Sequence, residues 1–294
     1  MFNNPTTQSP NQGSIFPPLC CNVNLPIGPK PLLFAFFLLL SMSLFTGCAS
    51  IYRPVLKEPL SHHDATTVIS KIRDQEDKVS SFYTFGSLLV KGWEWDTGAG
   101  ILIAGIRDPL KIKIEITHPW GKPMLHILID DTRLEVLSFG ENRLYLGDFT
   151  SETLSRFIPG FFFDHNMIWA VLRGYPYIKK HHRFESTAAN RISLFDKKER
   201  EIEIIDLHPE SLLPRRVTFP EQYLDLVFSG LKEGNGIYHA EEVIVNSMKE
   251  RKGLIFKSRK MVFNRTIPDQ IFILEKLPTF ETIYLDEVRD DRFK

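Results

Sequence analysis

The stretch Lys111-Ile112-Lys113-Ile114-Glu115-Ile116-Thr117 alternates strictly between polar and apolar residues. Successive side chains of a β-strand point to opposite faces of the sheet, so this stretch predicts a strand with one dry face and one wet face. Strands of this kind are typical of antiparallel sheets, whose second face can meet water. We therefore expect an antiparallel sheet with Ile112, Ile114 and Ile116 on one wall of its interior.

Further strand-like runs, separated by short polar turns, lie on both sides of this stretch. The clearest are 82–91, 100–106, 124–129, 134–139, 201–207, 241–246 and 254–264. We count ten or eleven strands, and no internal repeat or Gly/Ser-rich linker divides the chain. The pattern predicts one domain, a curved antiparallel sheet with helices against its concave side.

Three segments have helical patterns instead. Between Asp64 and Val79, apolar residues recur at helical spacing and charged residues occupy the other face, as in an amphipathic helix. A short helix is expected over 151–157, before Pro159-Gly160. Another is expected between Asp164, a favourable N-cap residue, and Gly174, a favourable helix stop.

Residues 1–47 have the layout of a secretory signal peptide. Lys30 precedes nine consecutive apolar residues at 32–40, and the apolar character continues to Phe45. An apolar run of about fifteen residues before small residues is typical of a cleaved signal, whereas a membrane-spanning helix needs ~20. The alternative is a short uncleaved membrane helix that ends in Gly-Cys by chance.

The end of this run, Leu44-Phe45-Thr46-Gly47-Cys48, resembles the lipobox of bacterial lipoproteins. The resemblance implies cleavage before Cys48 and attachment of lipid to that cysteine. Ala49 stands where an aspartate would signal retention in the inner membrane, so we expect the outer membrane, at its periplasmic face. Residues 48–61 then form a tether, 62–275 the folded domain and 276–294 a C-terminal tail.

Composition and motifs exclude several functions. Lys and Arg number 36, as do Asp and Glu, so the chain has no net positive charge for nucleic acid. The sequence contains none of the common signatures of nucleophilic, zinc or dinucleotide-dependent enzymes, and we expect no enzymatic activity, cofactor or metal. His62-His63 and His181-His182 have no second ligand set at fixed spacing and are interpreted as surface histidines.

Several short motifs agree in order and spacing with one family. Phe82-Tyr83-Thr84-Phe85-Gly86 is followed by Ile116-Thr117-His118-Pro119-Trp120-Gly121, by Arg143-Leu144-Tyr145 and by the segment 166–176. Over residues 64 to 230 this pattern resembles the LolB family of outer-membrane lipoprotein receptors. The chain departs from the family at His118 and Trp120, where the family has asparagine and leucine, and in its length beyond Phe263.

The resemblance implies a LolA/LolB-like fold, mainly β with flanking α, in which an unclosed antiparallel β-barrel is capped by short helices. It also implies a protein that takes lipoproteins from a LolA-like periplasmic carrier and inserts them into the outer membrane. A hydrophobic cavity would shield the acyl chains of this cargo. We assign the cavity to Ile112, Ile114, Ile116, Phe161, Phe162, Ile168, Trp169 and Leu172. The alternatives are an ordinary closed core and a LolB-like scaffold or interaction lipoprotein of the cell envelope without lipid cargo.

Pro119, Trp120 and Gly121 come shortly after the alternating strand, which ends at Thr117. A Pro-x-Gly sequence favours a tight turn whose central side chain projects into solvent. An indole ring with one N–H donor suits the headgroup region of a bilayer. By resemblance to the family's leucine, we assign these residues as a membrane insertion loop, the alternative being that Trp120 folds back as a lid or plug.

Overall fold

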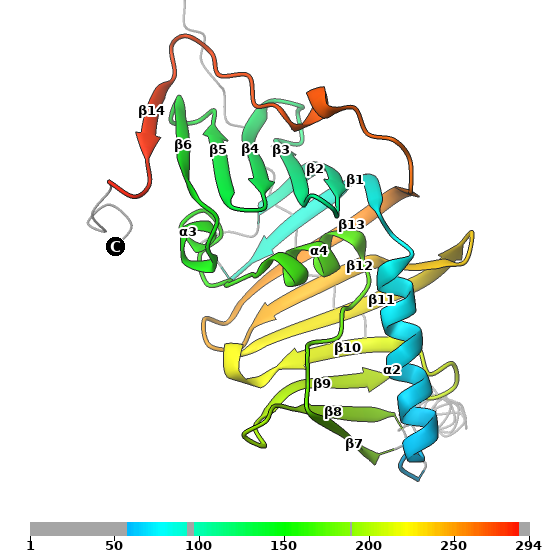
Figure 1. Cartoon of the computed structure of the whole chain (residues 1–294). Coiled ribbons are helices and arrows are strands. Elements are labelled where there is room, and N and C mark those ends of the chain that lie inside the picture. Colours follow the sequence, from blue (N-terminus) through cyan, green and yellow to red (C-terminus); the bar gives the residue numbers. More distant parts are fainter. Residues whose placement is uncertain (1–57, 93–96, 189, 288–294) are drawn as a thin grey trace, which may run out of the picture. The chain divides into compact units, whose positions relative to one another are not determined.

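The computed structural model describes residues 58–92, 97–188 and 190–287, and fourteen strands in these ranges pair into one sheet (Figure 1). The strand order is β14-β6-β5-β4-β3-β2-β1-β13-β12-β11-β10-β9-β8-β7. Neighbouring strands are antiparallel except β14 and β6, which are parallel. The strands are β1 (Ser81–Lys91), β2 (Thr97–Ile106), β3 (Lys111–Thr117), β4 (Pro123–Asp130), β5 (Arg133–Ser138), β6 (Arg143–Asp148), β7 (Arg183–Ala188), β8 (Arg191–Phe195), β9 (Glu201–Leu207), β10 (Pro214–Phe219), β11 (Leu224–Gly234), β12 (Ile237–Ser247), β13 (Lys252–Phe263) and β14 (Glu281–Tyr284).

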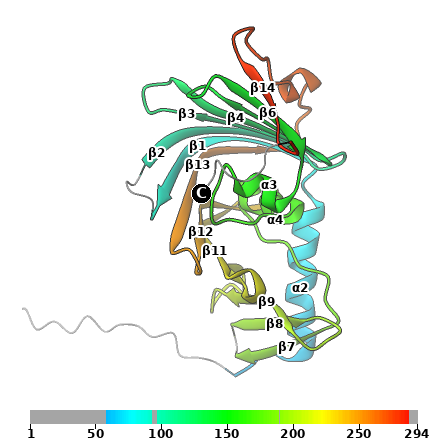
Figure 2. The same ribbon diagram turned by 90° about the vertical axis from the view of Figure 1, so that its left-hand side faces the viewer.

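The sheet curves around the short helices but does not close. β14 and β7 lie at its two ends, and no hydrogen-bonded ladder joins them in the described part of the chain. Figure 2 shows the sheet bending around α3 (Ser151–Ser155) and α4 (His165–Arg173). The expected mainly β, unclosed antiparallel sheet with helices on its concave side is confirmed.

The alternating stretch that predicted the sheet forms β3. Ile112 and Ile114 are buried, and they face Ile129 and Ile127 of β4 across the ladder. The polar residues between them lie on the other face, as the period of two requires. The predicted strand with one apolar and one polar face is confirmed, although its polar face is half-buried rather than fully exposed to water.

The helices begin and end close to the predicted residues. α2 (His62–Asp77) starts after Ser61, whose hydroxyl accepts a hydrogen bond from the Asp64 N–H. Asp164 caps α4 by accepting from the Met167 N–H at 2.8 Å, and Gly174 ends it in the left-handed conformation at φ 76°. None of the helices in the described ranges combines the length and hydrophobicity needed to cross a membrane.

After β13 the chain crosses the outer face of the sheet. Phe272 packs on Ala104 and Leu128, whose side chains point away from the main core, and a 3-10 helix (Asp269–Phe272) forms there. Phe280 then packs on Leu137 and Leu144 before β14 pairs with β6. Residues 264–280 thus form a strap across this outer face.

The strap and β14 correct two expectations. The sheet has fourteen strands in the described ranges rather than ten or eleven. Residues 276–287, assigned to a tail, contribute β14 to the sheet and the buried side chain of Leu285 to the main core. The fold therefore continues past residue 275, because apolar side chains of this segment are buried against the sheet.

Candidate functional site

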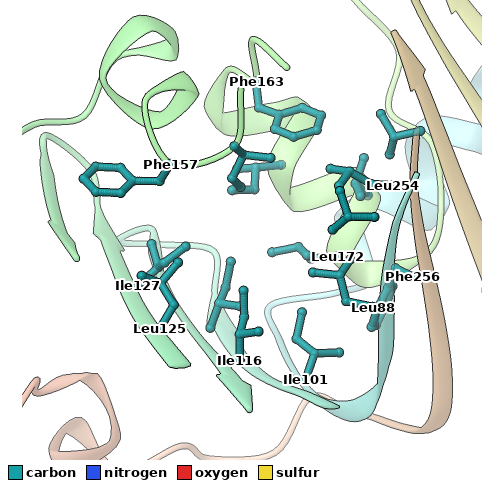
Figure 3. Close-up of a pocket in the computed structure, with 16 residues that line it drawn as sticks. Leu88, Ile101, Ile116, Leu125, Ile127, Phe157, Phe163, Leu172, Leu254 and Phe256 are labelled. Atoms are coloured by element: carbon teal, nitrogen blue, oxygen red, sulfur yellow. The ribbon is translucent and has the colours of Figure 1, made fainter. Parts of the chain in front are cut away.

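An apolar hollow of about 130 Å³ lies between the concave face of the sheet and the roof formed by residues 157–172 (Figure 3). The sheet contributes Leu88, Val90, Ile101, Ile114, Ile116, Leu125, Ile127, Val245, Leu254 and Phe256. The roof contributes Phe157, Ile158, Phe163, Ile168, Val171 and Leu172. All sixteen lining residues among the described ones are leucine, isoleucine, valine or phenylalanine.

The periodicity of each element brings these side chains to the hollow. On the sheet, eight of the ten lining residues come in pairs two positions apart, such as Ile114 and Ile116, because alternate residues of a strand share a face. On α4, Ile168, Val171 and Leu172 are separated by three and four positions and therefore lie on one side of the helix. The hollow follows from alternation on the strands and an apolar stripe on the helix.

Burial changes along the hollow and marks its mouth. Ile114 and Ile127 are buried, whereas Ile116 and Leu125, further toward the β3–β4 turn, are only half-buried. Leu88 and Val90 on β1 are half-buried as well. The hollow is therefore closed near the middle of the strands and opens at the end of the sheet where β3 leads into β4.

The lining determines which ligands the hollow can bind. An alkyl chain loses contact with water there without losing a hydrogen bond, and each buried methylene contributes about 0.8 kcal/mol. A polar or charged group would lose its hydration and find no hydrogen-bonding side chain among the described lining residues. The lining therefore favours apolar groups over polar or charged ones.

Four of the eight residues assigned to the cavity line it: Ile114, Ile116, Ile168 and Leu172. Ile112 and Trp169 are buried in the main core outside the lining, and Trp169 packs edge-on against Phe82 with ring centroids 4.9 Å apart.

Phe161 and Phe162 are also absent from the described lining. Phe161 is buried and stacks on Phe163, whereas Phe162 is 49% exposed. Phe163 is the phenylalanine of this run that lines the hollow among the described residues.

The turn at Trp120 has the expected form. The Gly121 N–H donates to the His118 carbonyl at 2.7 Å, and the His118 N–H donates to the Lys122 carbonyl at 2.8 Å. Gly121 has a φ of 81°, which favours glycine. Trp120 is 87% exposed and stacks on the His118 ring. Trp120 thus projects from the turn and does not fold back as a lid or plug.

Two ionisable side chains are buried outside the hollow. Arg173 donates from Nη1 to the Gln75 carbonyl at 3.0 Å, which ties α4 to the last turn of α2, and burial lowers its pKa to about 10. Glu203 accepts from the Lys179 N–H at 2.8 Å, and burial raises its pKa to about 8. Arg173 thus links α4 to α2, and Glu203 links β9 to the segment that follows α4.

The remaining assigned residues give no second site. Cys48, the expected lipid attachment residue, lies outside the described residues. His62 stacks on Phe184, and His181 contacts the Lys179 carbonyl. Within the described ranges, no three His, Cys, Asp or Glu side chains gather in a way that could hold a metal ion.

Comparison with known proteins identifies similar folds. No model of a known protein family matches the chain, and no curated protein sequence matches it significantly. A DUF1329 family protein from Desulfovibrio piger superposes with a TM-score of 0.51 at 12% identity, covering 74% of this chain and 98% of that one. This similarity shows a shared fold.

Two further solved structures are similar over comparable lengths. One is a putative outer membrane lipoprotein-sorting protein domain from Vibrio parahaemolyticus, with a TM-score of 0.47, 10% identity, and coverage of 71% of this chain and 97% of that one. The other is a LolA superfamily protein from Nitrosomonas europaea, with a TM-score of 0.45, 13% identity, and coverage of 72% and 99%.

Proposed function

We propose that the protein is lipid-anchored at the periplasmic face of the outer membrane, binds acyl chains of lipoproteins in the apolar hollow, and helps to insert them into that membrane. In this role it receives cargo from a LolA-like periplasmic carrier and catalyses no reaction. The observation that carries the proposal is the hollow itself, which is lined by aliphatic and phenylalanine side chains and opens toward the turn that carries Trp120.

The size of the hollow indicates how cargo would enter. At about 130 Å³ it is slightly smaller than an engineered apolar cavity of about 150 Å³ that binds one benzene molecule. A whole acyl chain therefore requires the roof at 157–172 to move away from the sheet. The six roof residues that line the hollow are all apolar, so an acyl chain can replace the apolar contacts that are lost when the roof moves.

The anchor and the turn support the membrane part of the proposal. The lipobox-like sequence ending at Cys48 would place the protein on the membrane through its own acyl chains, and several chains give stable attachment where one does not. Trp120 projects from the turn beside the mouth and suits the headgroup region. Cargo released at the mouth would then enter the same bilayer.

The binding test uses the processed chain, residues 48–294, with Cys48→Ser to remove the anchor. Leu88→Trp adds bulk at the half-buried mouth, and Leu102→Trp is the matched control on the outer face of the neighbouring strand. A fluorescent fatty acid should bind the parent protein and the Leu102→Trp variant, and bind the Leu88→Trp variant weakly. If the parent protein does not bind the probe, the scaffold alternative is favoured.

A second experiment tests delivery. The lipid-free processed chain is mixed with a lipoprotein-loaded carrier protein and with vesicles, and transfer of the lipoprotein to each is followed by crosslinking. We expect cargo to pass from the carrier to this protein and then to vesicles. Acyl-chain binding without any transfer would limit the function to lipid binding.

A further inference from the structure

Two turns on the other side of the mouth carry exposed apolar side chains. Tyr223 ends the β10–β11 connection and is 56% exposed, and Met248 follows β12 and is 47% exposed. The Met248 N–H donates to the Tyr223 carbonyl at 2.8 Å, so the two turns lie side by side. Tyr223 has a φ of 51°, a left-handed conformation that is uncommon for an aromatic residue. Two exposed apolar side chains therefore lie on adjacent, hydrogen-bonded turns.

Basic residues accompany this pair. Lys249 and Arg251 follow Met248 in the same turn and are exposed, as is Glu250 between them, so cations outnumber the single carboxylate over residues 249–251. No ion pair between described residues includes either of them. On the opposite side, Lys122 is exposed two residues after Trp120. Both surfaces thus combine an aromatic side chain with lysine or arginine.

The two surfaces flank the mouth of the hollow. Val245 and Leu254 line the hollow three residues before Met248 and three residues after Arg251. Leu125 lines it on the side of the Trp120 turn, and Figure 3 shows Leu125 and Leu254 on opposite sides of the space. Antiparallel pairing places both turns at the same end of the sheet, because β12 ends and β13 begins where β3 ends and β4 begins.

The geometry points to a second membrane-binding surface, formed by Tyr223, Met248, Lys249 and Arg251, that binds the headgroup region of an anionic bilayer. This inference rests on the proposed function, since it specifies how the mouth faces the membrane. Tyrosine sits well at the boundary between headgroups and acyl chains, and lysine and arginine are attracted to anionic lipids. The exposed cations make a bilayer with acidic headgroups the occupant that complements this surface in charge.

Two membrane contacts, one on each side of the mouth, fix the orientation of the domain, whereas one contact does not. A single contact at Trp120 would leave the domain free to rotate about that turn. Once one contact is made, the second forms at a high effective concentration, so the affinities reinforce each other. With one contact on each side, the mouth is held against the lipid, and an acyl chain leaving the hollow enters the bilayer without crossing water.

The test measures sedimentation of the processed Cys48→Ser chain, residues 48–294, with vesicles. One set of vesicles contains phosphatidylethanolamine and phosphatidylglycerol, and the other contains phosphatidylcholine alone. The variants are Tyr223→Ser with Met248→Ser, and Lys249→Gln with Arg251→Gln. Ile273→Ser with Leu277→Ser is the matched control, because it removes two exposed apolar side chains from the strap.

We expect the parent protein to bind the anionic vesicles, and the Tyr223/Met248 variant to bind them about tenfold more weakly. The Lys249/Arg251 variant should lose a similar factor on anionic vesicles and little on phosphatidylcholine. The strap control should bind like the parent. Binding of the fluorescent fatty acid should stay unchanged in all variants, since these residues are absent from the described lining of the hollow. Melting temperatures should also stay unchanged, because the substituted side chains are exposed.

The inference is overturned if the Tyr223/Met248 variant binds anionic vesicles as tightly as the parent, as it would if this surface binds another protein. It is also overturned if the Lys249/Arg251 variant weakens binding to both kinds of vesicle equally. Failure of the fatty-acid probe to bind the parent would instead contradict the proposed function, whatever the vesicles show.

Discussion

Arg156, directly after α3, donates a hydrogen bond from Nη1 to the carbonyl oxygen of Leu285, which lies 3.0 Å away and 129 residues later in the chain. Leu285 is buried, and its side chain lies so close to Gly147 of β6 that a Cβ at that glycine would come within 2.9 Å of it. The segment that follows β14 is thereby fixed to the sheet and to the start of the roof. The segment 281–285 therefore links the C-terminal end of α3 to the edge of the sheet.

Loss of the hydrogen bond between Arg156 and Leu285 should make the roof at 157–172 easier to move away from the sheet. Arg156→Ala removes the hydrogen bond to Leu285 and is expected to cost about 1 kcal/mol of stability. Because the roof must move for an acyl chain to enter, stopped-flow measurement should show faster binding of the fatty-acid probe. Arg143→Ala is the control, since it breaks an ion pair between β6 and Glu281 of β14 without touching α3. Equal rates in the two variants would show that the Leu285 contact does not restrain the roof.

The strap should be an integral part of the fold rather than a removable tail. Phe280→Ala deletes a buried ring between the strap and the strands β5 and β6, and a change of this kind typically costs 3 to 5 kcal/mol. Ile273→Ala, at a side chain that is 55% exposed on the same strap, should change stability by less than about 0.5 kcal/mol. Urea denaturation measures both. Similar small losses in both variants would mean that the strap contributes little to global stability.

The sequence predicted the face of each strand more reliably than the depth along it. Ile112 and Ile114 have the same alternation and the same face, yet only Ile114 lines the hollow. The difference arises from the distance of each residue from the open end of the sheet, which depends on the pairing of β3 with β2 and β4. A single strand contains no information about that depth.

Loops and edge strands were the harder parts to predict. Three consecutive phenylalanines at 161–163 look equivalent in sequence, but the backbone after Gly160 buries the first, exposes the second and turns the third toward the hollow. β7 was missed because Arg-Phe-Glu-Ser-Thr-Ala has little apolar character at the edge of the sheet, and β14 because it has four residues. The caps of α4 were predicted correctly, since Asp164 and Gly174 act through local hydrogen bonds and φ.

Glu203 should make the stability depend on pH. Burial raises its pKa to about 8 in the folded protein, whereas an unfolded glutamate titrates near 4.3. The folded state therefore holds the proton more tightly, so stability is greatest below about pH 4.3 as far as this group is concerned and falls as the pH rises toward 8. Above that pH the loss is complete and amounts to a few kcal/mol.

The measurement is urea denaturation at a series of pH values. Glu203→Gln cannot ionise and should flatten the decline between pH 5 and 8, so that the variant gains stability relative to the parent as the pH rises. Glu210→Gln, at an exposed position outside β9, is the control and should keep the parent's slope. An identical decline in the Glu203→Gln variant would assign the pH dependence to other groups.

Trp120 should sense the membrane directly. Its indole is 87% exposed, so its emission in water should be that of a solvated tryptophan and should shift to the blue when anionic vesicles are added. The other tryptophans are replaced by phenylalanine for this measurement, and Trp169→Phe alone serves as a folding control, because Trp169 is buried against Phe82.

Trp120→Glu should change the free energy of unfolding by less than about 0.5 kcal/mol, since an exposed side chain is replaced. The same variant should deliver less lipoprotein to vesicles while binding the fatty-acid probe normally, because a charged side chain is costly to bury among lipid chains. Unchanged emission with vesicles, together with normal delivery by Trp120→Glu, would remove this turn from the proposed mechanism.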